Sequence, residues 1–333
     1  MRRASQMSVK LGIFGMTTAL FCAVHFVRSV LIGATIVLSS GAALAQSPKS
    51  FATPAEASQQ LVAAIKASDE AQLAAMFGAA LKDWMNSGDQ VADQAARASF
   101  IASFERRNGI EQPSANKAII VTGEDQFPFP VPLVKSANGR WAFDPNGGKQ
   151  EMIDRRVGRN ERLTIGTLLA IGDAQMEFAT LNSERTGVAV YAQRFVSTAG
   201  TQDGLYWPTS GSAPRSPLGE LVATASLDGY RVGNKPTGAP SLPFNGYQFR
   251  MLFEQGNQAP GGAYSYLVNG RMIGGFAVIA WPVKYGVSGF KTFMMSHNLV
   301  VYESDLGPST EARVATIKTF NPDKSWSRAD TKR

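Results

Sequence analysis

Apolar residues recur at helical spacing in two separate stretches of the chain. The first stretch covers residues 50–108 and places Leu61 and Ile65 on one side of a helix. Thr53–Glu56 supplies a capping threonine, a first-turn proline and an acid, so it predicts where that helix begins. The second stretch, Asn160–Asn182, predicts one long amphipathic helix.

Extended segments follow the first helices. Residues 117–122 are typical of a strand, and the alternating prolines of residues 127–134 exclude helix there. Asn138 and Gly139 are a strong signal for a tight hairpin, which makes residues 140–144 the returning strand. Helices followed by strands linked in this way predict an α+β unit, with the helices on one face of a small curved antiparallel sheet.

The second half of the chain is dominated by strand patterning. Glycine and proline interrupt residues 183–262, where helix is expected only around residues 217–227. Further on, apolar segments and the turn at Asn269 and Gly270 predict an antiparallel meander. The expected strands are 246–253, 263–268, 272–281, 291–296 and 299–303, and a short helix is expected at 310–320.

The N-terminus has the pattern of a secretory signal. Basic residues come first, two apolar runs follow between residues 11 and 38, and Ala43–Ala45 has the small-x-small pattern of a cleavage site. Cleavage between Ala45 and Gln46 would release the mature protein into the periplasm or the cell exterior. The alternatives are an uncleaved anchor in the inner membrane, or a later start of translation.

Removal of this signal changes the composition that matters for function. It takes away Cys22 and leaves one histidine, His297, so no disulfide is available to the mature chain. The whole chain has 33 Lys and Arg against 26 Asp and Glu, and the signal carries four of these bases, which leaves 29 against 26. A weak positive balance without a long basic run predicts that nucleic acid is not a partner.

Few residues suit catalysis or metal binding. To act as a base, His297 would need a nucleophile and an orienting acid, and no motif singles either out, so a turn position is the simpler interpretation. One histidine and no cysteine argue against zinc. Asp83, Asp89 and Asp93 lack the alternating ligands of a calcium loop. We therefore expect no metal and no cofactor.

The candidate ligand-binding residues are Asp203, Tyr206, Trp207 and Arg271. An acid beside two aromatic residues suits the stacking of sugars, and the expectation requires that these side chains converge on one cleft. If a second acid lay near Asp203, the pair would suit hydrolysis of a cell-envelope polymer. A separate basic segment, Arg155–Glu161, would either bind an anion or form a salt network between domains.

Six short segments carry a resemblance to a known family. They are Phe127–Leu133, Trp141–Asp144, Arg155–Glu161, Asp203–Pro208, Pro260–Tyr264 and Val268–Phe276. In these segments the chain resembles an uncharacterised family of exported bacterial proteins, domain of unknown function 2950. The resemblance extends over nearly the whole mature chain and implies no known activity.

A second resemblance concerns the C-terminal half. Residues 161–180 are similar to the soluble half of the helix in type IV pilins and pseudopilins, and Phe276–Pro282 and Val300–Tyr302 are similar to the pilin meander. No prepilin cleavage site or hydrophobic half-helix precedes Glu161. The resemblance therefore implies a pilin-like C-terminal fold without polymerisation by the pilin route.

These patterns predict an α+β fold in which helices on a small curved antiparallel sheet precede a long helix packed on an antiparallel, pilin-like meander. The expected segments are a signal at 1–45, an N-terminal α+β domain at 46–155, a C-terminal pilin-like α+β domain at 156–325 and a tail at 326–333.

The expected function is non-enzymatic binding or assembly in the periplasm or at the cell surface. The expected partner is an unidentified envelope protein or polymer, and contact with a membrane would come only through an uncleaved N-terminus. The alternative function is the envelope-polymer hydrolase that would use Asp203 and a second carboxylate.

Overall fold

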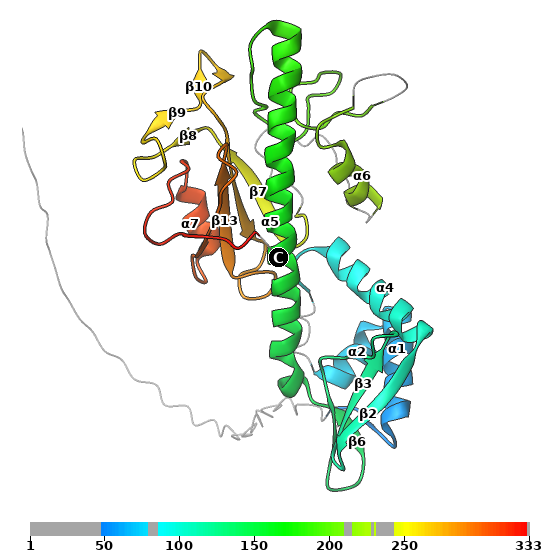
Figure 1. Ribbon diagram of the computed structural model, residues 1–333. Helices are drawn as coiled ribbons and strands as arrows, with labels where there is room; N and C mark the ends of the chain where they lie inside the picture. Colours follow the sequence, from blue (N-terminus) through cyan, green and yellow to red (C-terminus); the bar gives the residue numbers. More distant parts are fainter. Residues whose placement is uncertain (1–47, 79–85, 210–214, 228–229, 231–242, 332–333) are drawn as a thin grey trace, which may run out of the picture. The chain divides into compact units, whose positions relative to one another are not determined.

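The structure is a computed structural model that describes residues 48–78, 86–209, 215–227, 230 and 243–331 (Figure 1). The predicted signal and its cleavage site at Ala45 and Gln46 lie outside the described residues. Contacts within the chain group Gln46–Arg333 into one unit. Among the helices of the described part, none combines the length and the apolar character that a bilayer crossing requires.

The N-terminal part combines helices with an antiparallel sheet. The helices are α1 (Pro54–Lys66), α2 (Glu70–Phe77) and α4 (Gln90–Arg106). The strands are β1 (Ser50–Phe51), β2 (Asn108–Ser114), β3 (Lys117–Thr122), β4 (Phe127–Pro128), β5 (Leu133–Lys135) and β6 (Trp141–Phe143). The sheet has the order β1-β6-β5-β3-β2, with β4 paired to β3.

The predicted start of α1 is confirmed by its cap. The Glu56 amide donates to the Thr53 hydroxyl at 3.1 Å, and the Ala52 amide donates to the Glu56 carboxylate at 2.8 Å. The first bond satisfies an amide of the first helical turn, and the second fixes the residue before the cap to the start of the helix. Pro54 takes the first helical position, where the missing N–H costs nothing.

Apolar side chains of α1, α2 and the sheet form the N-terminal core. Phe77 and Phe143 lie in this core with ring centroids 4.7 Å apart. Helix α4 differs, because none of its residues is fully buried. Phe100 and Phe104 of α4 pack against the core from its edge and stay partly exposed. The side of the core next to α4 is therefore less completely filled.

The long helix α5 (Pro145–Thr186) begins well before the predicted start at Asn160. The Gly147 amide donates to the Asp144 side chain at 3.1 Å, which caps the helix. Gly148 argues against helix in the sequence, but a Cβ there would lie 2.5 Å from the Val131 Cα, so glycine allows close packing. Because α5 runs without a break through the expected domain boundary at residues 155 and 156, the division into two domains stays a prediction.

A five-stranded antiparallel sheet forms the C-terminal part, in the order β15-β14-β13-β12-β7. Its strands are β7 (Tyr247–Leu252), β12 (Ala277–Pro282), β13 (Lys291–Ser296), β14 (Val301–Asp305) and β15 (Ser327–Arg328). Helices α5 and α7 (Thr310–Thr316) both contact β12 (Figure 1). Every β12 residue except Trp281 is buried, so both faces of this strand are covered.

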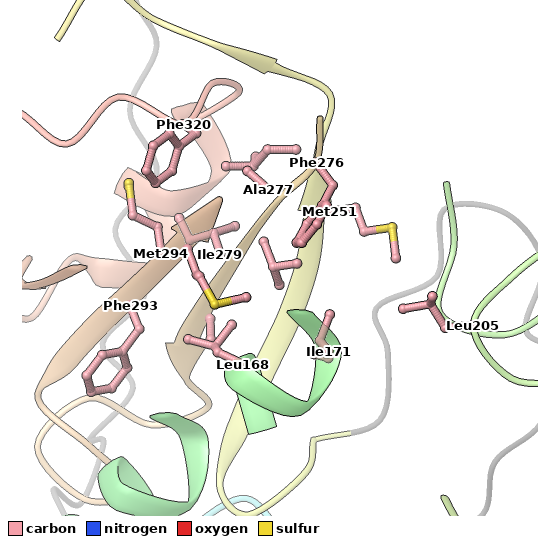
Figure 2. Close-up of a cluster of buried hydrophobic side chains, with 14 of the residues drawn as sticks. Leu168, Ile171, Leu205, Met251, Phe276, Ala277, Ile279, Phe293, Met294 and Phe320 are labelled. Atoms are coloured by element: carbon pink, nitrogen blue, oxygen red, sulfur yellow. The ribbon is translucent and has the colours of Figure 1, made fainter. Parts of the chain in front are cut away.

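The C-terminal core lies between α5 and this sheet. Leu168 and Ile171 of α5 point toward the strands that carry Met251 and Ile279 (Figure 2). Each fully buried side chain of this size contributes about 1.5–3 kcal/mol through removal from water. The predicted α+β class, with a long helix on an antiparallel sheet, is confirmed. The likeness to pilins stays a prediction.

Two of the expected strands are broken in the structure. Residues 263–268 divide into β9 (Tyr264–Ser265), which pairs with residues 254–255, and β10 (Leu267–Val268), which pairs with residues 271–272. Residues 272–281 divide into β11 (Arg271–Met272) and β12, and Gly275 between them has a φ of 139°. Only glycine adopts that conformation readily. The remaining elements are α6 (Gly219–Leu227) and β8 (Glu254–Gln255).

A buried aspartate joins α4 to the C-terminal part. Asp89 is 1% exposed and caps α4 by accepting from the Ala92 amide at 3.0 Å. Its other carboxylate oxygen accepts from the Tyr230 hydroxyl and the Gly246 amide, both at 2.8 Å. We call Asp89, Tyr230 and Gly246 the Asp89 junction. The Asp89 carboxylate thus accepts hydrogen bonds from three donors, one in α4 and two in later segments of the chain.

Candidate functional site

Asp203 lies in the loop after α5, and its carboxylate is bound within that loop. It accepts from the amide and hydroxyl of Thr198 and from the hydroxyl of Thr201 at 2.7 to 2.8 Å, and it pairs with Arg194 at 3.3 Å. Burial acts to raise the pKa of Asp203, but these hydrogen bonds and Arg194 together lower it. None of the described residues that bind the Asp203 carboxylate is an acid, and a carboxylate pair for hydrolysis stays a prediction.

Tyr206 and Trp207 serve mainly to hold the same loop against α5. The Tyr206 amide donates to the Phe195 carbonyl at 2.8 Å, which pairs two arms of the loop. Trp207 is 6% exposed and packs edge to face on Phe178 of α5, with ring centroids 6.5 Å apart. A tryptophan buried in this way presents little surface for stacking a sugar.

Arg271 is exposed on β11, opposite Val268 in the β10–β11 pair. Arg271 and Asp203 carry opposite charges, yet no ion pair joins them in the described part of the chain. Asp203 pairs with Arg194 instead. Convergence of the four candidate residues on one cleft therefore stays a prediction.

His297 lies in the turn after β13, among aromatic rings. Tyr266 and Phe276 contact its ring edge to face, at centroid distances of 5.7 and 6.5 Å. A Cβ on Gly275 would lie 2.5 Å from Nδ1 of His297, and this nitrogen has no hydrogen-bond partner among the described residues. Burial lowers the pKa of His297, which favours a neutral ring packed as part of the structure.

The N-terminal part contains a pocket that no single sequence motif indicated. Its volume is about 410 Å³, within the range of small-molecule sites. Residues of α1, α2, α4, β3 and α5 line it, together with the proline-rich segment Phe127–Val131. It lies beside α4, where the N-terminal core is least completely filled.

One wall of the pocket is aromatic. Phe129 lies at its centre, with ring centroids 5.3 Å from Phe100 and 6.5 Å from Phe77. The alternating prolines of Phe127–Val131 keep that segment extended, because proline fixes φ and restricts the residue before it. The rigid backbone thereby holds Phe129 against helices α2 and α4.

The other wall is basic, formed by Arg155, Arg156 and Arg159 of α5 and by Arg97 of α4. Arg155 donates to the Glu151 carboxylate at 2.6 Å and to the Pro128 carbonyl at 2.7 Å. Its guanidinium also stacks 4.5 Å above the Phe127 ring, so the two walls meet at this residue.

The remaining arginines differ in their surroundings. Burial lowers the pKa of Arg156, Asp93 opposes that effect, and the nearby charge of Arg159 adds to it. Arginine remains protonated at neutral pH in any case. The side chains of Arg97 and Arg159 form neither a hydrogen bond nor an ion pair with described residues.

The segment Arg155–Glu161 thus divides between two roles. Its arginines line the pocket, whereas Asn160 and Glu161 bind the C-terminal part. Asn160 donates to the Ser288 carbonyl at 3.0 Å, and Glu161 accepts from the amides of Phe290 and Lys291 at 2.9 and 3.0 Å. These contacts are hydrogen bonds to backbone groups and not ion pairs, so the salt network between domains stays a prediction, as does anion binding by the arginines.

The described residues contain no metal site, and the chain matches one family model. Within the described residues, no group of three or more His, Cys, Asp and Glu side chains is placed to hold a metal ion, and Asp83 lies outside them. The family model described as "Protein of unknown function (DUF2950)" matches residues 48–329. No curated protein and no solved structure matches the chain.

Proposed function

The chain belongs to the DUF2950 family, and since that family has no assigned function, we propose that this protein is an exported, non-enzymatic binding protein whose site is the N-terminal pocket. The observation that carries the proposal is the pocket itself, whose lining combines aromatic rings with arginines. A concave apolar site with a few placed polar groups is the usual form of a ligand pocket.

The surroundings of the other candidate residues support a non-enzymatic role. Asp203 is occupied by Thr198, Thr201 and Arg194, and a carboxylate whose pKa is lowered is a poor general acid. His297 contacts aromatic rings and has no orienting acid among the described residues. The described contacts of these two residues include neither a nucleophile for His297 nor a second carboxylate for Asp203, which nucleophilic and paired-carboxylate catalysis need.

The binding proposal is tested by blocking the pocket with one large side chain. Ala96 of α4 lines the pocket and is exposed, so Ala96→Trp fills the cavity without disturbing the core. Ala95→Trp is the matched control, because Ala95 is equally exposed on the same helix but does not line the pocket. Both variants carry the same helix-propensity cost of about 0.5 kcal/mol.

The measurement is a fluorescence titration of the exported protein with phenylnaphthylamine, an uncharged aromatic probe. We expect saturable binding that Ala96→Trp weakens at least about tenfold. Ala95→Trp should bind as the unaltered protein does. Absence of binding, or equal binding by both variants, would refute the proposed site.

The export part of the proposal has its own test. The full-length chain is expressed in a bacterial host, and the protein that accumulates outside the cytoplasm is examined by intact mass and N-terminal sequencing. Cleavage after Ala45, so that Gln46 is the first residue, is the expected result. Retention of residues 1–45 in a membrane fraction would support the anchored alternative.

A further inference from the structure

The pocket has two chemically different walls, which restricts the molecules that suit it. Phe77, Phe100 and Phe129 offer apolar ring surface, while the basic wall faces the same space. Resting on the function proposed above, we infer that the ligand is a small amphipathic anion, with an apolar body against the phenylalanines and one carboxylate or phosphate group at the arginines. An uncharged apolar molecule would leave the basic wall unused.

The charge of the lining favours an anion. Among the described lining residues, four arginines stand against one acid, Asp93. Glu151 adds a second acid next to the lining, but it is already paired with Arg155. Arg97, Arg155 and Arg156 are partly buried, where charges are screened less by solvent, whereas Arg159 is exposed. A bound anion would offset the repulsion between Arg156 and Arg159.

The arginines of the pocket also suit an anionic group as hydrogen-bond donors. A guanidinium donates two parallel hydrogen bonds to a carboxylate or a phosphate. Arg155 is held in place by Glu151 and by the Pro128 carbonyl, so its guanidinium is a fixed part of the pocket lining. Arg97 and Arg159 form no hydrogen bond or ion pair with described residues, so none of those residues competes with a ligand for their donors.

The size of the pocket sets the size of the ligand. A volume of about 410 Å³ is near the lower end of the range for small-molecule sites. That volume fits a compact ring system or a short chain with one head group, and it does not fit a folded partner protein. The apolar body and the anionic group are therefore parts of one small molecule.

The test compares two probes that share one ring skeleton. Anilinonaphthalene sulfonate carries an anionic group that phenylnaphthylamine lacks, so the difference between them isolates the charge. The variants are Arg159→Gln and Arg97→Gln, and Arg162→Gln is the control, because Arg162 is exposed on α5 outside the pocket.

Each pocket variant should weaken binding of the sulfonate probe about tenfold, the loss expected for one charge-assisted hydrogen bond, and leave the uncharged probe unchanged. Arg162→Gln should change neither. If Arg159→Gln and Arg97→Gln weaken both probes equally, or neither, the anion inference is wrong. The proposed function survives that result if Ala96→Trp still blocks phenylnaphthylamine, and it fails if Ala96→Trp blocks neither probe.

Discussion

The N-terminal and C-terminal parts are built from similar elements but differ in how completely their cores are packed. Both set helices against an antiparallel sheet, and both rely on aromatic and aliphatic side chains. In the C-terminal part, β12 is covered on both faces, and most of its side chains are completely buried. In the N-terminal part, α4 buries none of its residues fully and a pocket remains beside it. A completely packed core stabilises a fold, whereas an incompletely packed one leaves room for a ligand.

The largest expected effect distinguishes the two cores directly. Leu168→Ala removes a fully buried side chain from the C-terminal core and should lower the free energy of unfolding by about 2–5 kcal/mol. Phe100→Ala removes a larger side chain, but one that borders the pocket, so we expect a loss below about 2 kcal/mol. Urea denaturation of each variant measures both values.

Leu163→Ala is the control for Leu168→Ala, because both residues lie on α5. Leu163 is 43% exposed, so its removal should cost less than about 1 kcal/mol. If Phe100→Ala costs as much as Leu168→Ala or more, the region beside α4 is a packed core, and the comparison between the two parts fails.

The next effect concerns the Asp89 junction. Asp89→Ala removes the cap of α4 and leaves the Tyr230 hydroxyl and the Gly246 amide without their acceptor. We expect the free energy of unfolding to fall by about 2–4 kcal/mol, from the lost cap and the unsatisfied buried donors. Thermal or urea unfolding of the variant gives the value.

Asp69→Ala separates the cap from the junction. Asp69 caps α2 through the Gln72 amide at 2.9 Å, and its side chain forms no other hydrogen bond or ion pair with described residues. Its removal should cost about 1 kcal/mol, as a cap alone does. Equal losses for the two variants would mean that Asp89 acts only as a cap and that the contacts with Tyr230 and Gly246 contribute nothing.

The smallest effect is a pH dependence that belongs to the C-terminal part. Because burial lowers the pKa of His297, the unfolded chain takes up a proton at a higher pH than the folded chain does. Stability due to this residue is therefore complete above its ordinary pKa of about 6.5 and decreases as the pH falls toward the folded value.

His297→Gln should remove this dependence. Between about pH 7.5 and pH 5.5, the unaltered protein should lose up to about 1.4 kcal/mol more stability than the variant, as measured from urea midpoints. The histidine is the only one after residue 45, so no other imidazole confuses the comparison. Identical pH profiles for the two proteins would contradict the packed, neutral ring.

The elements that the sequence predicted well are those with buried faces. The strands expected at residues 117–122 and 291–296 match β3 and β13, because their apolar runs are bounded by clear turn residues. Strand β2 was not expected, since it is an exposed edge strand with polar residues and no alternation. The start of α5 was placed too late because Gly148, which packs against Val131, carries no helix signal.

The pocket could not be predicted in the same way. Its walls come from α2, α4, the Phe127–Val131 segment and α5, which are distant along the chain. A sequence search favours residues that are neighbours, such as Asp203, Tyr206 and Trp207, whereas these three hold one loop together. The sequence makes the arginines of Arg155–Glu161 candidates for anion binding, but only the fold places them in the same pocket lining as Phe129.

The most direct test of the account is a crystal structure of the exported protein grown with anilinonaphthalene sulfonate. We predict that the ring system lies against Phe100 and Phe129 and that the sulfonate accepts hydrogen bonds from Arg97 or Arg159. A probe bound elsewhere on the molecule, with the space beside α4 filled by the protein's own side chains, would contradict the claim that this pocket is the binding site.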